Sequence, residues 1–482
     1  MRLFVPYFRV AAVALLILSA LMLAPMGLTL VGYGGAHETY LLPLAASLAA
    51  GLIFKRLGHP APAHINQRQL FLITAGTWLT VPTFGMLPFM FMDNPLSLVD
   101  AAFETVSGMT TTGSTVMTGL EQTPKDILLW RSVLQWYGGI GIIGMTIAVL
   151  PSLKSGGMKL FRTESSDWSE KEIPQMKDLL KGIIGAYFGL SILCALAYWL
   201  AGMDAFNAIN HMMTTVSTGG YSTSDASFGQ FPSHLITWLA ILFMFAGAVP
   251  FVLYIRFWRK QSSRILSDIQ VKGLLFVLAS AAGFLTIDLV LTTEMTIFEA
   301  LTASAFNVMS VVTTTGYANA NYGLWGPAAV AIFFFLTFVG GCSGSTSGGI
   351  KIFRFQLFFI MLQRQFKQAI HPNAVLVSKY GTRLVTEEIL QSTIAFVFLL
   401  ITTLVVLTLL LSLTGLDFIT SITGASTALM NVGPGLGEMI GPAGNFQGVS
   451  DAAKSILMAG MILGRLEFTA IMIIFTRVFW RG

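Results

Sequence analysis

Long apolar segments recur along the whole chain and predict its main elements. The runs lie near residues 10–32, 39–54, 69–92, 127–150, 180–202, 235–258, 271–292, 325–341, 350–366, 389–413 and 453–480. An α-helix needs roughly 20 apolar residues to cross a bilayer, whereas the strands of a membrane barrel alternate apolar and polar positions. These runs are continuous, so they predict about ten transmembrane helices. The pair at 325–366 is expected to form one interrupted crossing.

Four short polar segments interrupt the apolar pattern at nearly even intervals. They lie at 110–114, 216–220, 313–317 and 430–434, and their predicted pivots are Gly113, Gly219, Gly316 and Gly433. Each segment follows an apolar stretch that is too short to cross a bilayer and precedes a longer run. Non-helical backbone is tolerated at membrane depth only where it is buried in protein or lines a watery cavity. The pattern therefore predicts four half-entering helices whose polar turns surround one cavity.

This arrangement predicts an all-α integral membrane protein. It has four repeats of helix, pore helix, filter turn and helix around one central pore, preceded by a helical hairpin. The expected units are the hairpin at 1–60 and the repeats at 61–166, 167–268, 269–372 and 373–482. The first apolar run is longer than the 7–15 residues of a secretory signal and has no clear small-residue cleavage site, so we expect it to be retained.

Charge distribution sets the expected orientation. The chain has 28 Lys and Arg, 11% charged residues and a net charge of +5. With the N-terminus in the cytoplasm, only Lys125, Arg131 and Lys454 fall outside, and Arg465 lies in mid-membrane. Short cytoplasmic loops collect Lys and Arg. The positive charge thus reflects the membrane and its lipids, and we expect no nucleic-acid partner.

The polar turns have the chemistry of a cation pathway. Glycine lets the backbone turn, and rings of carbonyl oxygens replace the hydration shell of a cation such as K⁺. The half-helices would also direct their negative dipole ends inward. The predicted cation-lining residues, acting mainly through backbone carbonyls, are Thr111, Thr112, Gly113, Ser217, Thr218, Gly219, Thr314, Thr315, Gly316, Asn431, Val432 and Gly433.

Acidic residues begin the four half-helices, at Asp100, Asp204, Glu299 and Asp417. One interpretation is favourable charge at a helix N-terminus. The other is a negative outer mouth that concentrates cations, to which Glu104, Asp225 and Glu438 would add.

Ten small or polar residues interrupt the third inner span. They are Gly340, Gly341, Cys342, Ser343, Gly344, Ser345, Thr346, Ser347, Gly348 and Gly349. A continuous helix is penalised by so many glycines, so we expect an intramembrane loop below the filter that acts as a gate. A surface loop is the alternative, but the flanking runs are apolar and close.

Arg465 lies inside the last apolar run. An intramembrane arginine is costly and faces a cavity or a partner. It is expected either to bind backbone carbonyls or a buried acid, or to place a positive barrier to cations beneath the filter.

The remaining features carry little chemistry. Cys194 and Cys342 are expected to be buried apolar residues, and His211 is expected to be structural rather than a proton site. No catalytic triad, phosphate-binding loop or metalloprotease motif appears, which argues against an enzyme. The charged connectors at 151–181, 256–272 and 364–388 are either solvated surface or a dock for a cytosolic partner.

The four polar turns, the 340–349 loop, the sequence Gly464-Arg465-Leu466-Glu467-Phe468 and the N-terminal hairpin together resemble the Trk/Ktr/HKT superfamily of potassium transporters. The likeness covers essentially the whole chain and is greatest to the membrane subunits of the bacterial Trk system. It maps the family's filter glycines onto Gly113, Gly219, Gly316 and Gly433, and its pore arginine onto Arg465. Glycine at all four positions implies a preference for K⁺. The fourth turn, Asn431-Val432-Gly433-Pro434, departs from the Thr-Gly pattern, so the fourfold symmetry is approximate.

The resemblance implies a homodimer in the bacterial inner membrane, with one pore per subunit and a cytosolic ring of TrkA-type nucleotide-binding subunits. The expected function is channel-like uptake of K⁺ and Rb⁺, with no organic cofactor in this chain. A secondary transporter that couples K⁺ to H⁺ or Na⁺ is the first alternative, since discontinuous helices also occur there. A membrane-embedded enzyme and a non-transporting scaffold are further alternatives.

Overall fold

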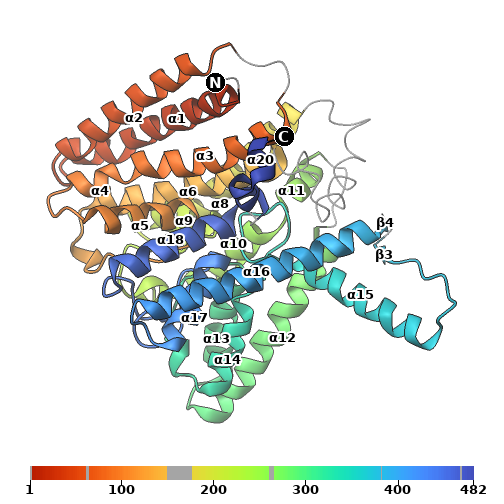
Figure 1. The fold of residues 1–482 in the computed structure, drawn as a ribbon. Helices are drawn as coiled ribbons and strands as arrows, with labels where there is room; N and C mark the ends of the chain where they lie inside the picture. The colour runs from red at the N-terminus through yellow and green to blue at the C-terminus, as the bar shows by residue number, and fades with distance from the viewer. Residues whose placement is uncertain are drawn as a thin grey trace.

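The computed structural model describes residues 3–60, 65–148, 176–259, 265–381, 383–466 and 469–481. Its N-terminal hairpin consists of α1 (Val5–Leu30) and α2 (Glu38–Leu57), which lie side by side against α3 at one flank of the molecule (Figure 1). The Ser19 hydroxyl donates a hydrogen bond to Ser47 Oγ at 3.0 Å. Small residues let apolar helices approach closely, and Tyr137 Oη joins the hairpin to the first repeat by donating to Ala14 O.

Each of the four repeats contains one short pore helix between longer segments. The first has α3 (Gln67–Gly85), α4 (Leu87–Phe91), the pore helix α5 (Leu98–Met109) and α6 (Lys125–Ala148). The second has α8 (Met176–Leu200), the pore helix α9 (Ala205–Val216), α10 (His234–Ala248) and α11 (Phe251–Trp258). Short 3₁₀ turns η1 (Leu120–Gln122) and η3 (Ser227–Gln230) follow the pore helices.

The third and fourth repeats follow the same order. The third has η4 (Ile265–Ser267), α12 (Ile269–Thr292), the pore helix α13 (Ile297–Val312), η5 (Tyr322–Leu324), α14 (Pro327–Leu336) and α15 (Ile352–Ile370). The fourth has α16 (Glu387–Leu413), the pore helix α17 (Phe418–Met430), α18 (Asp451–Arg465), α19 (Thr469–Met472), η6 (Ile473–Phe475) and α20 (Arg477–Arg481). The predicted boundary at 166/167 and most of the 151–181 connector lie outside the described residues.

Six helical segments of the described chain are long and apolar enough to cross a membrane. They are Val5–Leu30, Glu38–Leu57, Gln67–Phe91, Asp178–Leu200, Ile269–Thr292 and Glu387–Leu413. The bent pair α10 and α11 makes a seventh if it is one span. Three predicted crossings remain. One is α6, which carries the polar residues Arg131 and Gln135. The other two, at 325–366 and 453–480, are interrupted helices.

Two predicted continuous spans are broken. The run 235–258 bends by 94° between α10 and α11, where Val249 precedes Pro250. Proline has no amide hydrogen to donate and disfavours helical backbone in the preceding residue. The run 453–480 ends its first helix at Arg465 and continues as the short elements α19, η6 and α20.

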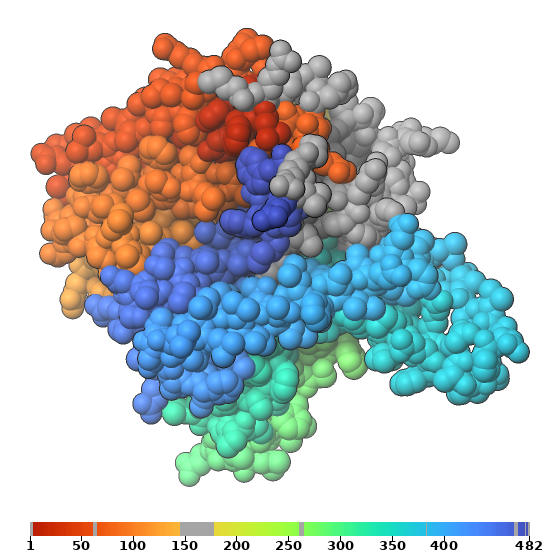
Figure 2. Space-filling view, in the orientation of Figure 1, coloured from red at the N-terminus to blue at the C-terminus, as the bar shows by residue number. Residues whose placement is uncertain are grey.

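The interruption predicted at 340–349 is present. A two-residue parallel pair, β1 (Val339–Gly340) with β2 (Ile350–Lys351), closes the loop between α14 and α15. A second pair, β3 (Lys379–Tyr380) antiparallel to β4 (Arg383–Leu384), follows α15. Figure 2 shows α15 and the segment after it, in cyan, standing out from the body of the molecule.

Candidate functional site

The four polar turns share one backbone conformation. In each, a residue two positions before a glycine has a positive φ of 51–55°, and that glycine has a positive φ as well. The residue pairs are Thr111 with Gly113, Thr218 with Gly220, Thr314 with Gly316 and Asn431 with Gly433. Left-handed backbone in a threonine costs energy and persists only where the surroundings impose it. The repetition therefore marks four equivalent, locally strained sites.

Backbone hydrogen bonds fix this conformation at the end of each pore helix. The first left-handed residue donates its N–H three residues back, as from Thr111 to Gly108 O at 2.9 Å. The next residue donates five residues back, as from Thr112 to Ser107 O at 2.9 Å. The same pattern occurs in all four repeats, so each pore helix is terminated in the same way.

The second turn corrects the predicted register by one residue. Gly220, and not Gly219, has the positive φ of 78° that matches Gly113, Gly316 and Gly433. The prediction of Gly219 as the pivot is wrong, because the Gly219-Gly220 pair offers two glycines and only the second is equivalent. Gly219 instead takes the place of Thr112, Thr315 and Val432, and Thr218 takes the place of Thr111.

The four turns form a closed ring. A Cβ atom added at each glycine would overlap a backbone carbonyl oxygen of the next repeat. Gly113 faces Gly219 O, Gly220 faces Thr315 O, Gly316 faces Val432 O and Gly433 faces Thr112 O. The contacts run in order from the first repeat to the fourth and back to the first. The predicted grouping of all four turns around one axis therefore has a direct geometric basis.

The fourth turn replaces a threonine with Asn431 and stabilises it differently. Asn tolerates left-handed backbone better than a β-branched residue does. Its Nδ2 donates to Thr112 Oγ1 at 3.0 Å and to Met461 O at 2.9 Å. Asn431 thus joins the fourth turn to the first turn and to α18.

The pore helices begin with side-chain caps. Ser97, Asp204, Thr296 and Asp417 occupy the N-cap positions, and each side chain accepts a hydrogen bond from a backbone N–H in the first turn. Two of the four predicted acids are therefore caps, whereas Asp100 and Glu299 lie in the first turn. These contacts favour the helix-terminus interpretation of the four acids.

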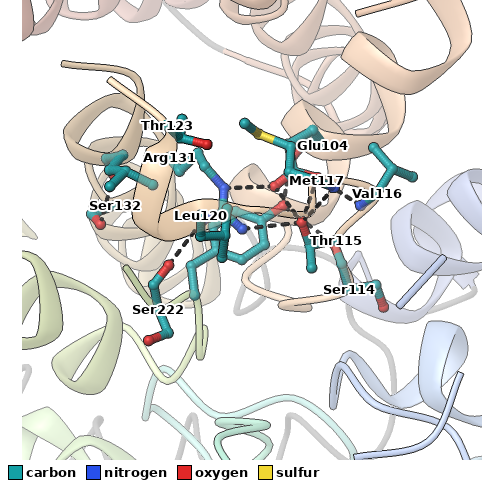
Figure 3. Close-up of polar contacts among 12 residues, drawn as sticks. Glu104, Ser114, Thr115, Val116, Met117, Leu120, Thr123, Arg131, Ser132 and Ser222 are labelled. Atoms are coloured by element: carbon teal, nitrogen blue, oxygen red, sulfur yellow. Dashed lines mark hydrogen bonds and ion pairs between the residues drawn. The ribbon is translucent and has the colours of Figure 1, made fainter. Parts of the chain in front are cut away.

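Glu104 and Arg131 form a buried ion pair that the sequence did not predict. Arg131 Nε lies 2.7 Å from Glu104 Oε1, and the side chains are 1% and 0% exposed. Figure 3 shows the pair among residues that follow the first and second turns. Glu104 is therefore not a free anion at the outer mouth, and Arg131 is buried in protein rather than in an outer loop.

The outer loops of the first two repeats also hold each other. Asp225 accepts from the N–H groups of Gly119 and Leu120, at 2.7 and 3.2 Å. Glu121 in turn accepts from Ser224 Oγ and from Asp225 N. The hydrogen bond from Ser224 lowers the pKa of the Glu121 carboxyl. Asp225, which was predicted to add negative charge at the outer mouth, therefore already accepts hydrogen bonds from two backbone N–H groups.

The 340–349 loop lies directly against the ends of three pore helices. Thr346 Oγ1 donates to Val216 O at 3.1 Å, Gly348 N donates to Thr314 Oγ1 at 2.6 Å, and Gly349 N donates to Met430 O at 2.9 Å. Cys342 N also donates to Ala248 O at the bend between α10 and α11. Most of the loop is buried.

Arg465 contacts this loop. Its Nη2 donates to Thr346 O at 2.8 Å, and the residue is 6% exposed. Arg465 Nε has no hydrogen-bond partner among the described residues. The backbone-carbonyl interpretation of this arginine is therefore realised, in the loop that was predicted to gate the pathway.

His211 and the cysteines are buried. The His211 ring nitrogens contact Asn207 O at 2.9 Å and Ser222 Oγ at 3.1 Å. Both partners are neutral. Cys194 and Cys342 are free and buried. No group of three His, Cys, Asp or Glu suited to a metal occurs in the described ranges.

Comparisons with known proteins identify the family. The model of the family described as "TrkH: Cation transport protein" matches residues 42–480. The chain belongs to the TrkH family. It is 46% identical over 482 residues to the Trk system potassium uptake protein TrkI of Halomonas elongata, covering 100% of this chain and 98% of that protein.

Further relatives agree over nearly the full length. The Trk system potassium uptake protein TrkH of Escherichia coli is 34% identical over 485 residues, with 98% of each chain covered. The crystal structure of the potassium transporter TrkH from Vibrio parahaemolyticus matches with a TM-score of 0.91 and 32% identity. That match covers 99% of this chain and 100% of the other. The chain is thus a multi-pass membrane protein whose relatives are transporters.

Proposed function

We propose that this chain is the K⁺-translocating subunit of a bacterial potassium uptake system. Its relatives are named potassium uptake proteins. The observation that carries the proposal is the closed ring of four equivalent turns, in which each glycine contacts a carbonyl of the next repeat. A ring of carbonyl oxygens replaces the hydration shell of a permeating cation.

In this proposal the four turns form the selectivity filter. K⁺ and Rb⁺ are the transported ions, and backbone carbonyls provide most ligands. The filter consists of Thr111, Thr112, Gly113, Thr218, Gly219, Gly220, Thr314, Thr315, Gly316, Asn431, Val432 and Gly433, with Ser217 at the end of its pore helix. Glycine at each pivot leaves room for the neighbouring carbonyl, so the turns approach as closely as their backbones allow.

The gate consists of the 340–349 loop and Arg465. The loop is held by hydrogen bonds to the second, third and fourth pore helices or turns. Arg465 both binds Thr346 O and adds a positive charge below the filter. Opening requires these hydrogen bonds to break, so conduction depends on displacement of the loop.

The wider assembly is proposed from the family resemblance and from the charge pattern. Loops rich in Lys and Arg support an N-terminus in the cytoplasm of a bacterial inner membrane. The cytoplasmic connectors bind a TrkA-type nucleotide-binding ring that controls the gate. A homodimer is proposed from the family resemblance, with the projecting helix α15, on which Phe359 and Phe366 are more than half exposed, as its interface.

The proposal is tested by measuring current through the purified protein in liposome patches under opposing K⁺ and Na⁺ gradients. A current that reverses near the K⁺ equilibrium potential is expected. Flux that requires a second gradient, of H⁺ or Na⁺, would instead establish the coupled transporter.

A further inference from the structure

Arg131 joins three backbone segments at the junction of the first and second turns. It comes from α6 and is 1% exposed. Its Nε donates to Glu104 Oε1 at 2.7 Å, its Nη1 to Ser222 O at 2.9 Å and its Nη2 to Thr115 Oγ1 at 3.1 Å (Figure 3). One guanidinium group therefore contacts the first pore helix and the segments that leave both turns.

Glu104 extends the same contacts on the side of the first turn. Both of its carboxylate oxygens accept from Thr115 Oγ1 at 3.0 Å, and Oε2 also accepts from Val116 N at 3.0 Å. Thr115 and Val116 follow the pivot Gly113 closely in the chain. A carboxylate that accepts several donors has little freedom to move, so the backbone leaving the first turn is fixed.

Tyr221 completes the junction on the side of the second turn. The Arg131 guanidinium lies over its ring, 4.2 Å from the centroid. The Tyr221 hydroxyl donates to Glu104 O at 2.7 Å. Gln135, one helical turn beyond Arg131, donates to Gly219 O and accepts from Tyr221 N at 3.0 Å. α6 thus holds the second turn at two points, the Gly219 carbonyl and the amide of Tyr221, which follows the pivot Gly220.

Stability alone does not explain a buried ion pair. Desolvation of two charges offsets much of their attraction, and replacing both with apolar residues is often neutral or stabilising. At the neighbouring junctions the turns themselves are joined by neutral groups, as where Ser114 Oγ donates to Gly433 O at 2.8 Å, or where Tyr317 Oη contacts Thr214 Oγ1. An ion pair between the fourth and first repeats, Lys454 with Asp100, lies at the first turn of α5 instead. What the arginine adds is a rigid, planar fork with three separate directions.

We propose that Arg131 is a positioning residue for ion selection. With Glu104 it fixes the separation of the first and second filter turns, and it contacts no permeating ion itself. This inference rests on the proposed K⁺ pathway. It requires that discrimination between K⁺ and Na⁺ falls when the Arg131 guanidinium group is removed, even where the protein folds normally.

The test measures the K⁺/Na⁺ permeability ratio from the reversal potential, which does not depend on the number of active pores. Arg131→Lys keeps the positive charge but cannot reach three acceptors at once. Thr115→Val preserves side-chain shape and leaves the ion pair intact. The permeability ratio is expected to fall about tenfold in Arg131→Lys, as for loss of a hydrogen bond to a charged group, and by a smaller factor in Thr115→Val.

A double variant separates positioning from folding. Glu104→Leu with Arg131→Met removes both charges, so its thermal unfolding in detergent should stay near that of the unmodified protein. Its permeability ratio should nevertheless fall as in Arg131→Lys. Ser132→Ala is the matched control, because this adjacent α6 hydroxyl donates to Leu128 O within its own helix.

The outcomes distinguish the two proposals. If the unmodified protein is K⁺-selective and the double variant and Thr115→Val both retain its permeability ratio, the positioning role is overturned. If the unmodified protein carries no K⁺-selective current, the proposed function fails, and this inference fails with it.

Discussion

At the scale of single residues, the pivot glycines meet two requirements at once. Each has a positive φ, and each leaves no space for a Cβ because a carbonyl of the next repeat is already there. A side chain at such a position is strained by its backbone and displaces the neighbouring turn as well. The geometry of the ring is thus sensitive to a single added atom.

Replacing Gly220 with serine should therefore lower the K⁺/Na⁺ permeability ratio by about tenfold or more, because the added Cβ overlaps Thr315 O and C. Reversal potentials in liposome patches would measure it. Gly189→Ala in α8 is the control, since nothing lies within 4 Å of its added Cβ. An unchanged ratio in Gly220→Ser would remove Gly220 from the filter.

The residue types of the site could be read from the sequence, but not all of their positions. Polar segments that contain glycine, at nearly even spacing, indicate four turns. The doublet Gly219-Gly220 leaves the register open by one residue, because either glycine permits a turn. Only the backbone dihedral angles and the contact of Gly220 with Thr315 O distinguish them.

At the scale of elements, the 340–349 loop is held by hydrogen bonds of Thr346 and, from outside the loop, of Gln270, Thr314 and Arg465. Thr346 Oγ1 contacts both Val216 O and Gly247 O, at 3.1 and 2.9 Å. These are neutral hydrogen bonds, each worth about 1 kcal/mol. In the proposed gate, opening of the loop must break these hydrogen bonds.

Thr346→Val should raise the open probability about fivefold, because valine keeps the shape of threonine but donates no hydrogen bond. Single-channel recordings would measure it. Thr337→Val at the C-cap of α14 is the control, since that hydroxyl donates to Phe333 O in the preceding helix. An open probability equal to that of the unmodified protein would argue against a gating role for the loop.

The hydrogen bonds between the Glu121 and Asp225 loops should depend on pH in one direction. The pKa of Glu121 is lowered by its hydrogen bond from Ser224. Its contribution is therefore complete above the ordinary glutamate pKa of about 4.3 and is lost as the pH falls through the lower folded value. Hydrogen exchange at the Asp225 amide, which donates to Glu121, should stay protected at neutral pH.

Protection of that amide should disappear only in strong acid, and Glu121→Gln should abolish this acid-dependent change. Loss of protection already near pH 6 would contradict the assignment, because a lowered pKa cannot produce it.

Helices could be predicted wherever the length of an apolar run determines whether it crosses the membrane. The hairpin, the outer spans and the four pore helices follow from run length and from polar interruptions. The bend at Pro250 and the end of α18 at Arg465 were not predicted, although Pro250 was a usable signal. Hydropathy does not distinguish a straight span from a bent one.

At the scale of the whole molecule, α15 should form part of a subunit interface. Its Phe359 and Phe366 are 63% and 66% exposed on a helix that stands out from the body. If the proposed homodimer uses this helix, Phe359→Gln with Phe366→Gln should convert the detergent-solubilised protein from dimer to monomer, as measured by light scattering. Phe276→Gln on α12, which replaces a 74% exposed residue, is the control. A double variant that remains dimeric would exclude this interface.

Long-range polar contacts were beyond the sequence. Arg131 reaches Glu104 in its own repeat and Ser222 in the next, and Lys454 reaches Asp100 from the opposite end of the chain at 2.6 Å. These partners share no spacing rule. From the sequence, Arg131 and Lys454 could be assigned only to one side of the membrane. The structure shows that each forms an ion pair inside the protein.

A single polypeptide that supplies all four turns can make each quarter of the ring different. In an assembly of four identical subunits, an arginine behind one turn would be present behind every turn, and four buried charges would surround the ion. Here Arg131 occurs once, and the four carbonyl positions belong to Thr112, Gly219, Thr315 and Val432. A single mutation therefore alters one quadrant of the proposed filter and leaves the other three as they are.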